Sequence, residues 1–247
     1  MSLKFKKKFL AIITARKGSK GVKNKNLKKI NDKPLIFYTF DFIKKNKIFN
    51  NALLTTNSDE LINYSRKFPF IECPFKRPEY LSKDQSPQED AILHALNWFE
   101  NKYYSPDFIC ILEPTTPFRF RNTFNKAFQI LKDEKIDGVF TVTKSRHDPT
   151  LIKPLRKDRS MKNWDLFVKN RQEYSDHFSL TSSAVIIKTS YFKKYKTCIS
   201  QKSRAIVVDN FEGIMIDDKL DFFLVKSLIE KKITSSSKLN DYIDSIS

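Results

Sequence analysis

Paired cysteines, long apolar runs and a secretion signal are the features that this 247-residue sequence lacks. Its three cysteines, Cys73, Cys110 and Cys198, are far apart, and no two have the spacing of a metal or redox pair. No uninterrupted apolar run approaches the roughly 18 residues that a membrane span needs. The basic start is followed only by residues 9–14 as an apolar stretch, which is short for a signal sequence. We therefore expect a reduced, cytoplasmic protein without a membrane partner.

Acidic residues are scarce at the start of the chain. The sequence has 46 Lys and Arg against 28 Asp and Glu, and residues 1–50 hold 15 of the basic residues but only 2 of the acidic ones. This basic end favours a polyanionic partner, either nucleic acid or a nucleotide polyphosphate. A coding bias toward Lys, Asn, Ile and Phe is an alternative explanation of the excess of basic residues. The aromatic residues there follow helical periodicity and form no exposed stacking platform, so we expect no nucleic-acid partner, and a nucleic-acid-binding protein stays the less favoured alternative.

Apolar runs alternate with amphipathic segments along most of the chain, which is 40% hydrophobic. Strands alternating with helices predict βαβ units and a mainly parallel α/β sheet, whose ligands bind beyond the carboxyl ends of the strands. We expect helix caps at Ser86, within a Ser-x-x-Glu box, at Asn122, and at Asp218. The expected strands are 9–14, 52–56, 108–112, 138–143, 183–188 and 205–208, and the expected helices are 35–43, 60–68, 87–101, 123–132 and 219–230.

The loop after the first strand is the first candidate binding site. Gly18 and Gly21 free the backbone to approach an anion, and exposed backbone N–H groups can hold a phosphate. Arg16, Lys20 and Lys25 add positive charge suited to a triphosphate. The spacing matches neither the Walker A motif nor the Rossmann fingerprint, so a solvated basic loop stays an alternative.

A series of motifs, in order along the chain, resembles the acylneuraminate cytidylyltransferases, which include enzymes that activate sialic, legionaminic and pseudaminic acids. The resemblance covers about residues 9–230. The motifs are Ala15-Arg16-Lys17-Gly18-Ser19-Lys20-Gly21 with Lys25-Asn26-Leu27, Arg77-Pro78-Glu79-Tyr80-Leu81 with Asp84, Glu113-Pro114-Thr115-Thr116-Pro117-Phe118-Arg119, Arg171-Gln172-Glu173, and Ile216-Asp217 with Leu220-Asp221.

This resemblance implies a mainly parallel Rossmann-like sheet in a homodimer. One catalytic domain would span 1–230, residues 144–182 would form a dimerisation and sugar-side excursion, and 231–247 a tail. The implied reaction transfers CMP from CTP to an acidic nine-carbon sugar and releases pyrophosphate, with Mg²⁺ as cofactor. The implied site residues are Arg16, Lys25 and Asp217 for catalysis, Asp217 also for the metal, Ala15, Gly18, Ser19, Lys20, Asn26, Arg77 and Gln88 for the nucleotide, and Glu113, Thr115, Arg171 and Thr181 for the sugar.

The sequence departs from the family pattern mainly on the acceptor side. Glu113 stands where the family has glutamine, Ser179 where it has an arginine, and Met215 where it has the first aspartate of its closing motif. The sugar strand is replaced by residues 181–185. Another acidic acceptor, such as a different ulosonate or a phosphonate, and a catalytically silent CTP-binding protein therefore stay open as alternatives.

Overall fold

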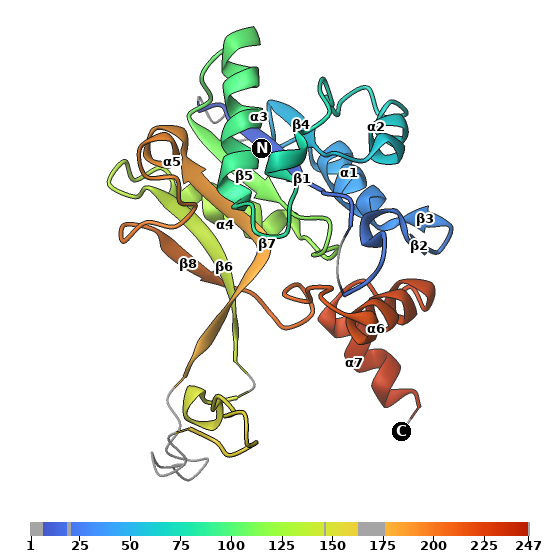
Figure 1. Cartoon of the computed structure of the whole chain (residues 1–247). Helices are drawn as coiled ribbons and strands as arrows, with labels where there is room; N and C mark the ends of the chain where they lie inside the picture. Colours follow the sequence, from blue (N-terminus) through green and yellow to red (C-terminus); the bar gives the residue numbers. More distant parts are fainter. Residues whose placement is uncertain (1–6, 19–20, 146, 163–175, 247) are drawn as a thin grey trace.

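The structure is a computed structural model and describes residues 7–18, 21–145, 147–162 and 176–246. Its centre is a six-stranded sheet in the order β4-β1-β5-β7-β6-β8 (Figure 1). The strands are β1 (Phe9–Thr14), β4 (Asn51–Thr55), β5 (Phe108–Leu112), β6 (Gly138–Lys144), β7 (Phe178–Lys188) and β8 (Arg204–Val207). The α/β fold predicted from the alternating pattern is therefore confirmed.

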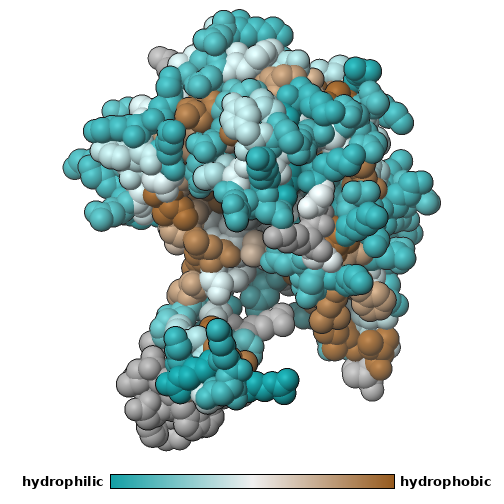
Figure 2. Space-filling view, in the orientation of Figure 1, coloured by the Kyte–Doolittle hydropathy of each residue, from teal (hydrophilic) through white to brown (hydrophobic). Residues whose placement is uncertain are grey.

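Strand β7 is the exception to the parallel arrangement. β1 pairs in parallel with β4 and β5, and β6 with β8, whereas β7 runs antiparallel to both β5 and β6. β7 begins at Phe178, five residues earlier than the strand we expected, so residues 178–182 of the predicted excursion are part of the sheet. The paired ends of β6 and β7 extend away from the body of the molecule (Figure 1, Figure 2).

Helices cover both faces of the sheet because the strands are apolar on both. The odd-numbered residues of β1 pack with α1 (Leu35–Asn46), α2 (Asp59–Ser65) and α4 (Arg121–Ile130). The even-numbered ones pack with α3 (Gln88–Lys102) and α5 (Thr189–Tyr195). A third apolar cluster joins α6 (Lys219–Glu230) to the loop after β1 through Val22 and Ile216. This cluster brings the two ends of the sequence together.

Short elements complete the chain. They are the 3-10 turns η1 (Lys25–Leu27), η2 (Glu79–Leu81) and η3 (Pro149–Leu151), the two-residue strands β2 (Lys29–Ile30) and β3 (Lys33–Pro34), and helix α7 (Ser236–Asp244). Helix α7 lies within the predicted tail and has no buried residue. Among the described helices, none is long and apolar enough to cross a membrane.

Two predicted helix caps are wrong and one is confirmed. Helix α3 begins after Pro87, and the Ser86 hydroxyl instead donates to the Tyr80 carbonyl at 2.6 Å, so the predicted Ser86 box does not form. Helix α4 begins after Phe120, which leaves Asn122 inside its first turn and without a capping role. Asp218 caps α6 in a reciprocal box with Asp221. Among the described residues, the Asp218 carboxylate bonds only within the first turn of α6, whereas the hydroxyl of Ser86 bonds to the preceding turn.

Candidate active site

A cavity of about 300 Å³ lies at the carboxyl ends of the first parallel strands. The cavity is lined by Thr14, the last residue of β1, and by three residues of the turn after β5, Glu113, Pro114 and Thr115. This is where an open parallel sheet is expected to bind its ligand. The loop after β1 forms the opposite wall with Arg16, Gly21, Lys25 and Asn26.

Backbone contacts hold the loop after β1 against the neighbouring strand. Ala15 is buried, and its N–H donates to the Thr55 carbonyl at 3.2 Å. The Lys17 N–H donates to the side chain of Asn57 at 2.8 Å. Gly18 has φ +82°, a left-handed conformation that glycine adopts without strain. Ser19 and Lys20, two of the predicted nucleotide ligands, lie outside the described residues.

Arg16 and Lys25 bring positive charge to the cavity from the two ends of this loop. The Arg16 guanidinium pairs with Asp84 at 2.7 Å, and both side chains are partly exposed. Lys25 is 9% exposed and donates from Nζ to the Ile216 carbonyl. Burial lowers the pKa of Lys25, against the opposing effects of the nearby Asp217 and Glu113 carboxylates. An anionic ligand would supply further negative charge to this desolvated ammonium group.

Gly21 is packed directly against the segment that carries Asp217. A Cβ added to Gly21 would stand 1.9 Å from the Asp217 carbonyl oxygen, so only glycine allows this approach. Asp217 itself is exposed, and its backbone N–H donates to the Asp221 carboxylate at 2.9 Å. The structure therefore brings the backbone of the Asp217 segment against the predicted phosphate loop, although Asp217 is not among the described residues that line the cavity.

Arg77 and Asn26 line the same cavity but are held by protein partners. The Arg77 guanidinium is 5% exposed and donates to the Thr55 carbonyl at 2.6 Å and to its hydroxyl at 3.1 Å. Desolvation, and secondarily the charge of Arg16, lowers the pKa of Arg77 to about 10. Asn26 Nδ2 donates to the Arg16 carbonyl at 3.3 Å, which braces the loop from inside.

Gln88 links the nucleotide wall to the acceptor wall. Its Nε2 donates to the Thr14 hydroxyl at 2.7 Å and to Glu113 Oε1 at 2.9 Å. Thr115 lines the cavity, and its carbonyl accepts from the Ile216 N–H at 2.9 Å. Of the four predicted sugar ligands, Glu113 and Thr115 therefore share this cavity.

Thr181, another predicted sugar ligand, is not among the described residues that line this cavity. Thr181 is 5% exposed, and its hydroxyl lies 2.7 Å from that of Thr141 inside the sheet. Arg171 lies outside the described residues. The sugar-binding assignment of both stays a prediction.

Two buried charged groups near the site were not predicted from the sequence. Glu212 is 4% exposed and accepts from the hydroxyls of Thr123 and Ser183, each at 2.8 Å. Burial raises the pKa of Glu212. Arg119 is 7% exposed and lies behind the Glu113 turn. Arg119 ends a recognisable motif, whereas no local pattern marks Glu212.

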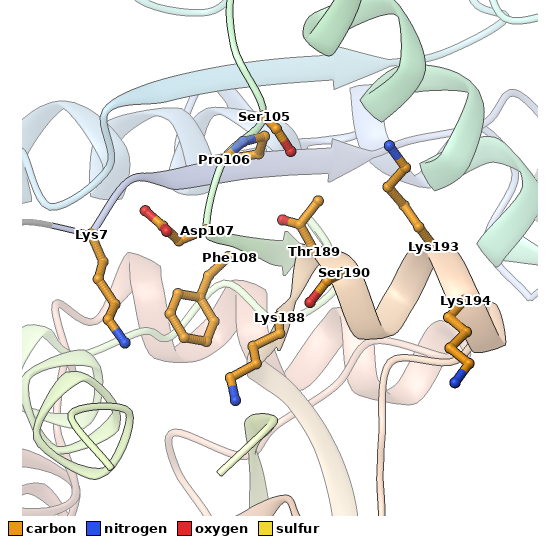
Figure 3. Close-up of a pocket in the computed structure, with 10 residues that line it drawn as sticks. All are labelled: Lys7, Ser105, Pro106, Asp107, Phe108, Lys188, Thr189, Ser190, Lys193 and Lys194. Atoms are coloured by element: carbon orange, nitrogen blue, oxygen red, sulfur yellow. The ribbon is translucent and has the colours of Figure 1, made fainter. Parts of the chain in front are cut away.

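A larger cleft of about 760 Å³ lies elsewhere, next to Lys7, Asp107 and Phe108 at the amino ends of β1 and β5 (Figure 3). Three of its lysines have acidic partners: Lys193 pairs with Glu100 at 2.6 Å, Lys188 with Asp137 at 3.4 Å and Lys7 with Glu134 at 3.5 Å. Because parallel sheets bind ligands at the opposite end, the smaller basic cavity is the better candidate.

A basic cavity at the carboxyl ends of parallel strands, with a glycine-containing loop as one wall, defines an α/β protein of the class that binds phosphorylated nucleotides. Comparison with known proteins gives the family. The family model described as cytidylyltransferase matches residues 10–204, and the chain belongs to this family. The resemblance found in the motifs is thereby confirmed.

Relatives agree with this assignment. The chain is 30% identical over 229 residues to the N-acylneuraminate cytidylyltransferase of Escherichia coli, covering 91% of this chain but only 53% of that protein. It thus spans about half the length of that relative. It is 26% identical over 228 residues to the CMP-N,N'-diacetyllegionaminic acid synthase of Campylobacter jejuni, covering 90% of this chain and 95% of that one.

A solved structure supports the fold. A CMP:2-keto-3-deoxy-manno-octonic acid synthetase complexed with CTP superposes with a TM-score of 0.67 and 12% identity, covering 91% of this chain and 99% of the other.

Proposed function

We propose that the protein transfers CMP from CTP to a nonulosonic acid and releases pyrophosphate. Family membership supports the cytidylyl transfer, and the names of the relatives in Escherichia coli and Campylobacter jejuni support an acidic nine-carbon sugar as acceptor. The observation that carries the proposal is the contact of Gly21 with the Asp217 segment. This contact brings the Asp217 segment against the loop whose Arg16 and Lys25 line the cavity, and the Asp217 carboxylate is close enough to oppose the lowering of the Lys25 pKa, which supports the proposal.

The reaction needs positioning and charge neutralisation more than covalent chemistry. A hydroxyl group of the sugar loses its proton to water, and its oxygen attacks the α-phosphorus of CTP. A new O–P bond forms, and the bond between this phosphorus and the pyrophosphate oxygen breaks. Negative charge grows on the leaving pyrophosphate. Arg16 would neutralise that charge, and Lys25 would hold the triphosphate. Because Lys25 is nearly buried, its charge acts in a low-dielectric environment and is screened little by water.

Mg²⁺ is the cofactor that we propose for this site. Its octahedral shell accepts one or two carboxylates together with phosphate oxygens and waters. The exposed carboxylate of Asp217 fits that role, whereas the thioether of Met215 is a poor ligand for a hard cation. Among the described residues there is no cluster of three or more metal-ligating side chains. The ion would neutralise phosphate charge.

The acceptor side of the cavity carries a negative charge. Glu113 presents a carboxylate to the cavity in which an acidic sugar would bind, and Gln88 holds that carboxylate in place. We propose an acceptor with a basic or less anionic substituent facing Glu113, in preference to unmodified N-acetylneuraminate. A homodimer and a cytoplasmic location also stay predictions.

Two measurements test the function. The first is thermal stabilisation by each nucleoside triphosphate, with and without Mg²⁺, for which we expect a shift selective for CTP. The second is pyrophosphate release from CTP across a panel of nonulosonic acids. Release with at least one of them is the expected result. A CTP-selective shift without release from any acid would identify a silent CTP-binding protein, and the absence of any shift would refute the proposal.

A further inference from the structure

Arg119 is a buried cation whose described hydrogen-bond acceptors are all uncharged. Its side chain is 7% exposed, and desolvation lowers its pKa to about 10. Burying a guanidinium group is unfavourable unless its donors are well satisfied. Its four described bonds go to three backbone carbonyls and one hydroxyl. These neutral acceptors offset the desolvation, so the position of Arg119 depends on several segments being in register.

The acceptors belong to three different segments. Nη2 donates to the carbonyl of Glu113, in the turn that follows β5. Nε donates to the Ser183 carbonyl at 3.1 Å, and Nη2 to the Ser182 carbonyl at 3.5 Å, both on β7. Nη1 donates to the hydroxyl of Thr39 on α1 at 3.2 Å. The planar fork of donors is what allows one side chain to join all three.

Strands β5 and β7 need a donor between them near Arg119 because their pairing ends there. The antiparallel pairing of β5 with β7 ends at Ile111 and Val185. Beyond it, the carbonyls of Glu113 and Ser183 are both acceptors and cannot bond to each other. The guanidinium group donates to both, so it replaces the missing rung of the ladder.

The same stretch of β7 is irregular toward its other neighbour. Phe140 of β6 pairs with Val185, but the next residue, Thr141, pairs with Thr181, so residues 182–184 bulge out of the ladder. Carbonyls in a bulge lose their ladder partners and need others. The Thr141 hydroxyl accepts from the Ala184 N–H at 3.1 Å, and Arg119 donates to the carbonyls of Ser182 and Ser183.

We propose that Arg119 is a positioning residue that fixes the Glu113 turn relative to β7, and through this turn sets the acceptor side of the cavity. The turn carries the Glu113 carboxylate, which lines the cavity. A shift of the turn at Glu113 would therefore move this carboxylate. Arg16 and Arg77 of the nucleotide wall are held by Asp84 and Thr55 instead, so their positions do not depend on Arg119.

The test is Arg119→Lys, and it rests on the proposed function. A lysine keeps the positive charge, but its single ammonium group cannot span acceptors on three segments. We expect CTP to bind within about twofold of the parent in calorimetry. The KM for the acceptor should rise about tenfold or more, and kcat should fall. Arg121→Lys, a change at an exposed arginine two residues away, is the matched control and should leave all three values unchanged.

Each outcome is informative. If the parent protein releases no pyrophosphate with any nonulosonic acid, the proposed function fails and not the role of Arg119. An unchanged acceptor KM in a folded Arg119→Lys protein, or an equal loss of CTP affinity, would overturn the positioning role. If Arg119→Lys does not fold, the isosteric Thr39→Val removes one of the bonds and should raise the acceptor KM severalfold with CTP binding unchanged. No change in Thr39→Val would then overturn the inference.

Discussion

Replacing Gly21 by alanine should damage the site more than a one-carbon change suggests. The new Cβ would lie 1.9 Å from the Asp217 carbonyl oxygen and 3.0 Å from the carbonyl carbon. These are backbone atoms, so they cannot rotate away as a flexible side chain could. Asp217 is followed by the capped first turn of α6, which holds it in place. To reach an ordinary contact, the two segments must separate by about 1 Å or more.

Two effects of different size follow from this separation. Overpacking of this kind destabilises a protein by roughly 1–3 kcal/mol. A displacement of about 1 Å in a positioned catalytic group can lower the rate by about 10²-fold. We therefore expect a modest loss of unfolding free energy, a large loss of turnover, and a higher Mg²⁺ concentration for half-maximal activity, because the Asp217 carboxylate moves away from the triphosphate.

Gly18→Ala is the control that separates the clash from the loss of backbone freedom. Gly18 has φ +82°, and no atom lies within 4 Å of its added Cβ. Alanine there should cost about 1–2 kcal/mol through its left-handed backbone, without moving Asp217. Urea unfolding and Mg²⁺-dependent pyrophosphate release are measured for both variants. A Gly21→Ala protein with the parent's turnover and Mg²⁺ dependence would refute the coupling of the two segments.

Further substitutions test the individual roles. Arg16→Ala should lower turnover by about 10²-fold or more, because a charge-assisted contact to a developing phosphate charge contributes roughly 3 kcal/mol. Lys25→Ala should chiefly weaken CTP binding. If both variants keep the kinetics of the parent protein, the loop is only a solvated basic surface. Asp217→Ala should abolish Mg²⁺-dependent turnover with the fold intact, since Asp218 still caps α6, and Met215→Asp should tighten Mg²⁺ binding in titrations with CTP. Glu113→Gln should raise the efficiency for unmodified N-acetylneuraminate relative to an amine-bearing nonulosonate by about tenfold, and an unchanged ratio in competition assays would show that Glu113 does not select the acceptor.

Local sequence was enough to predict most elements of the fold. The apolar runs 9–14 and 108–112 became β1 and β5 with the expected bounds, because a buried parallel strand needs only a short apolar segment. The cap at Asp218 was also predictable, since both partners of its box lie within one turn. Ser86 shows the limit of such reasoning. A better-placed acceptor from a neighbouring turn captured its hydroxyl, and no local pattern reveals that competition.

The nucleotide loop was predictable from its motif, but the assembly of the site was not. The loop itself indicated Arg16 and Lys25 as residues suited to phosphates, and the family resemblance added Asp217 as a ligand suited to a hard cation. Only the tertiary structure brought the Lys25 ammonium to the Ile216 carbonyl, 191 residues away in sequence. It also packed the Asp217 backbone against Gly21, where a side chain would leave no room for it. The antiparallel course of β7 and the bridging of its bulge by Arg119 likewise arise from strand register. Motifs depend on neighbouring residues and are therefore visible in sequence, whereas long-range register is decided by the packing of the whole sheet.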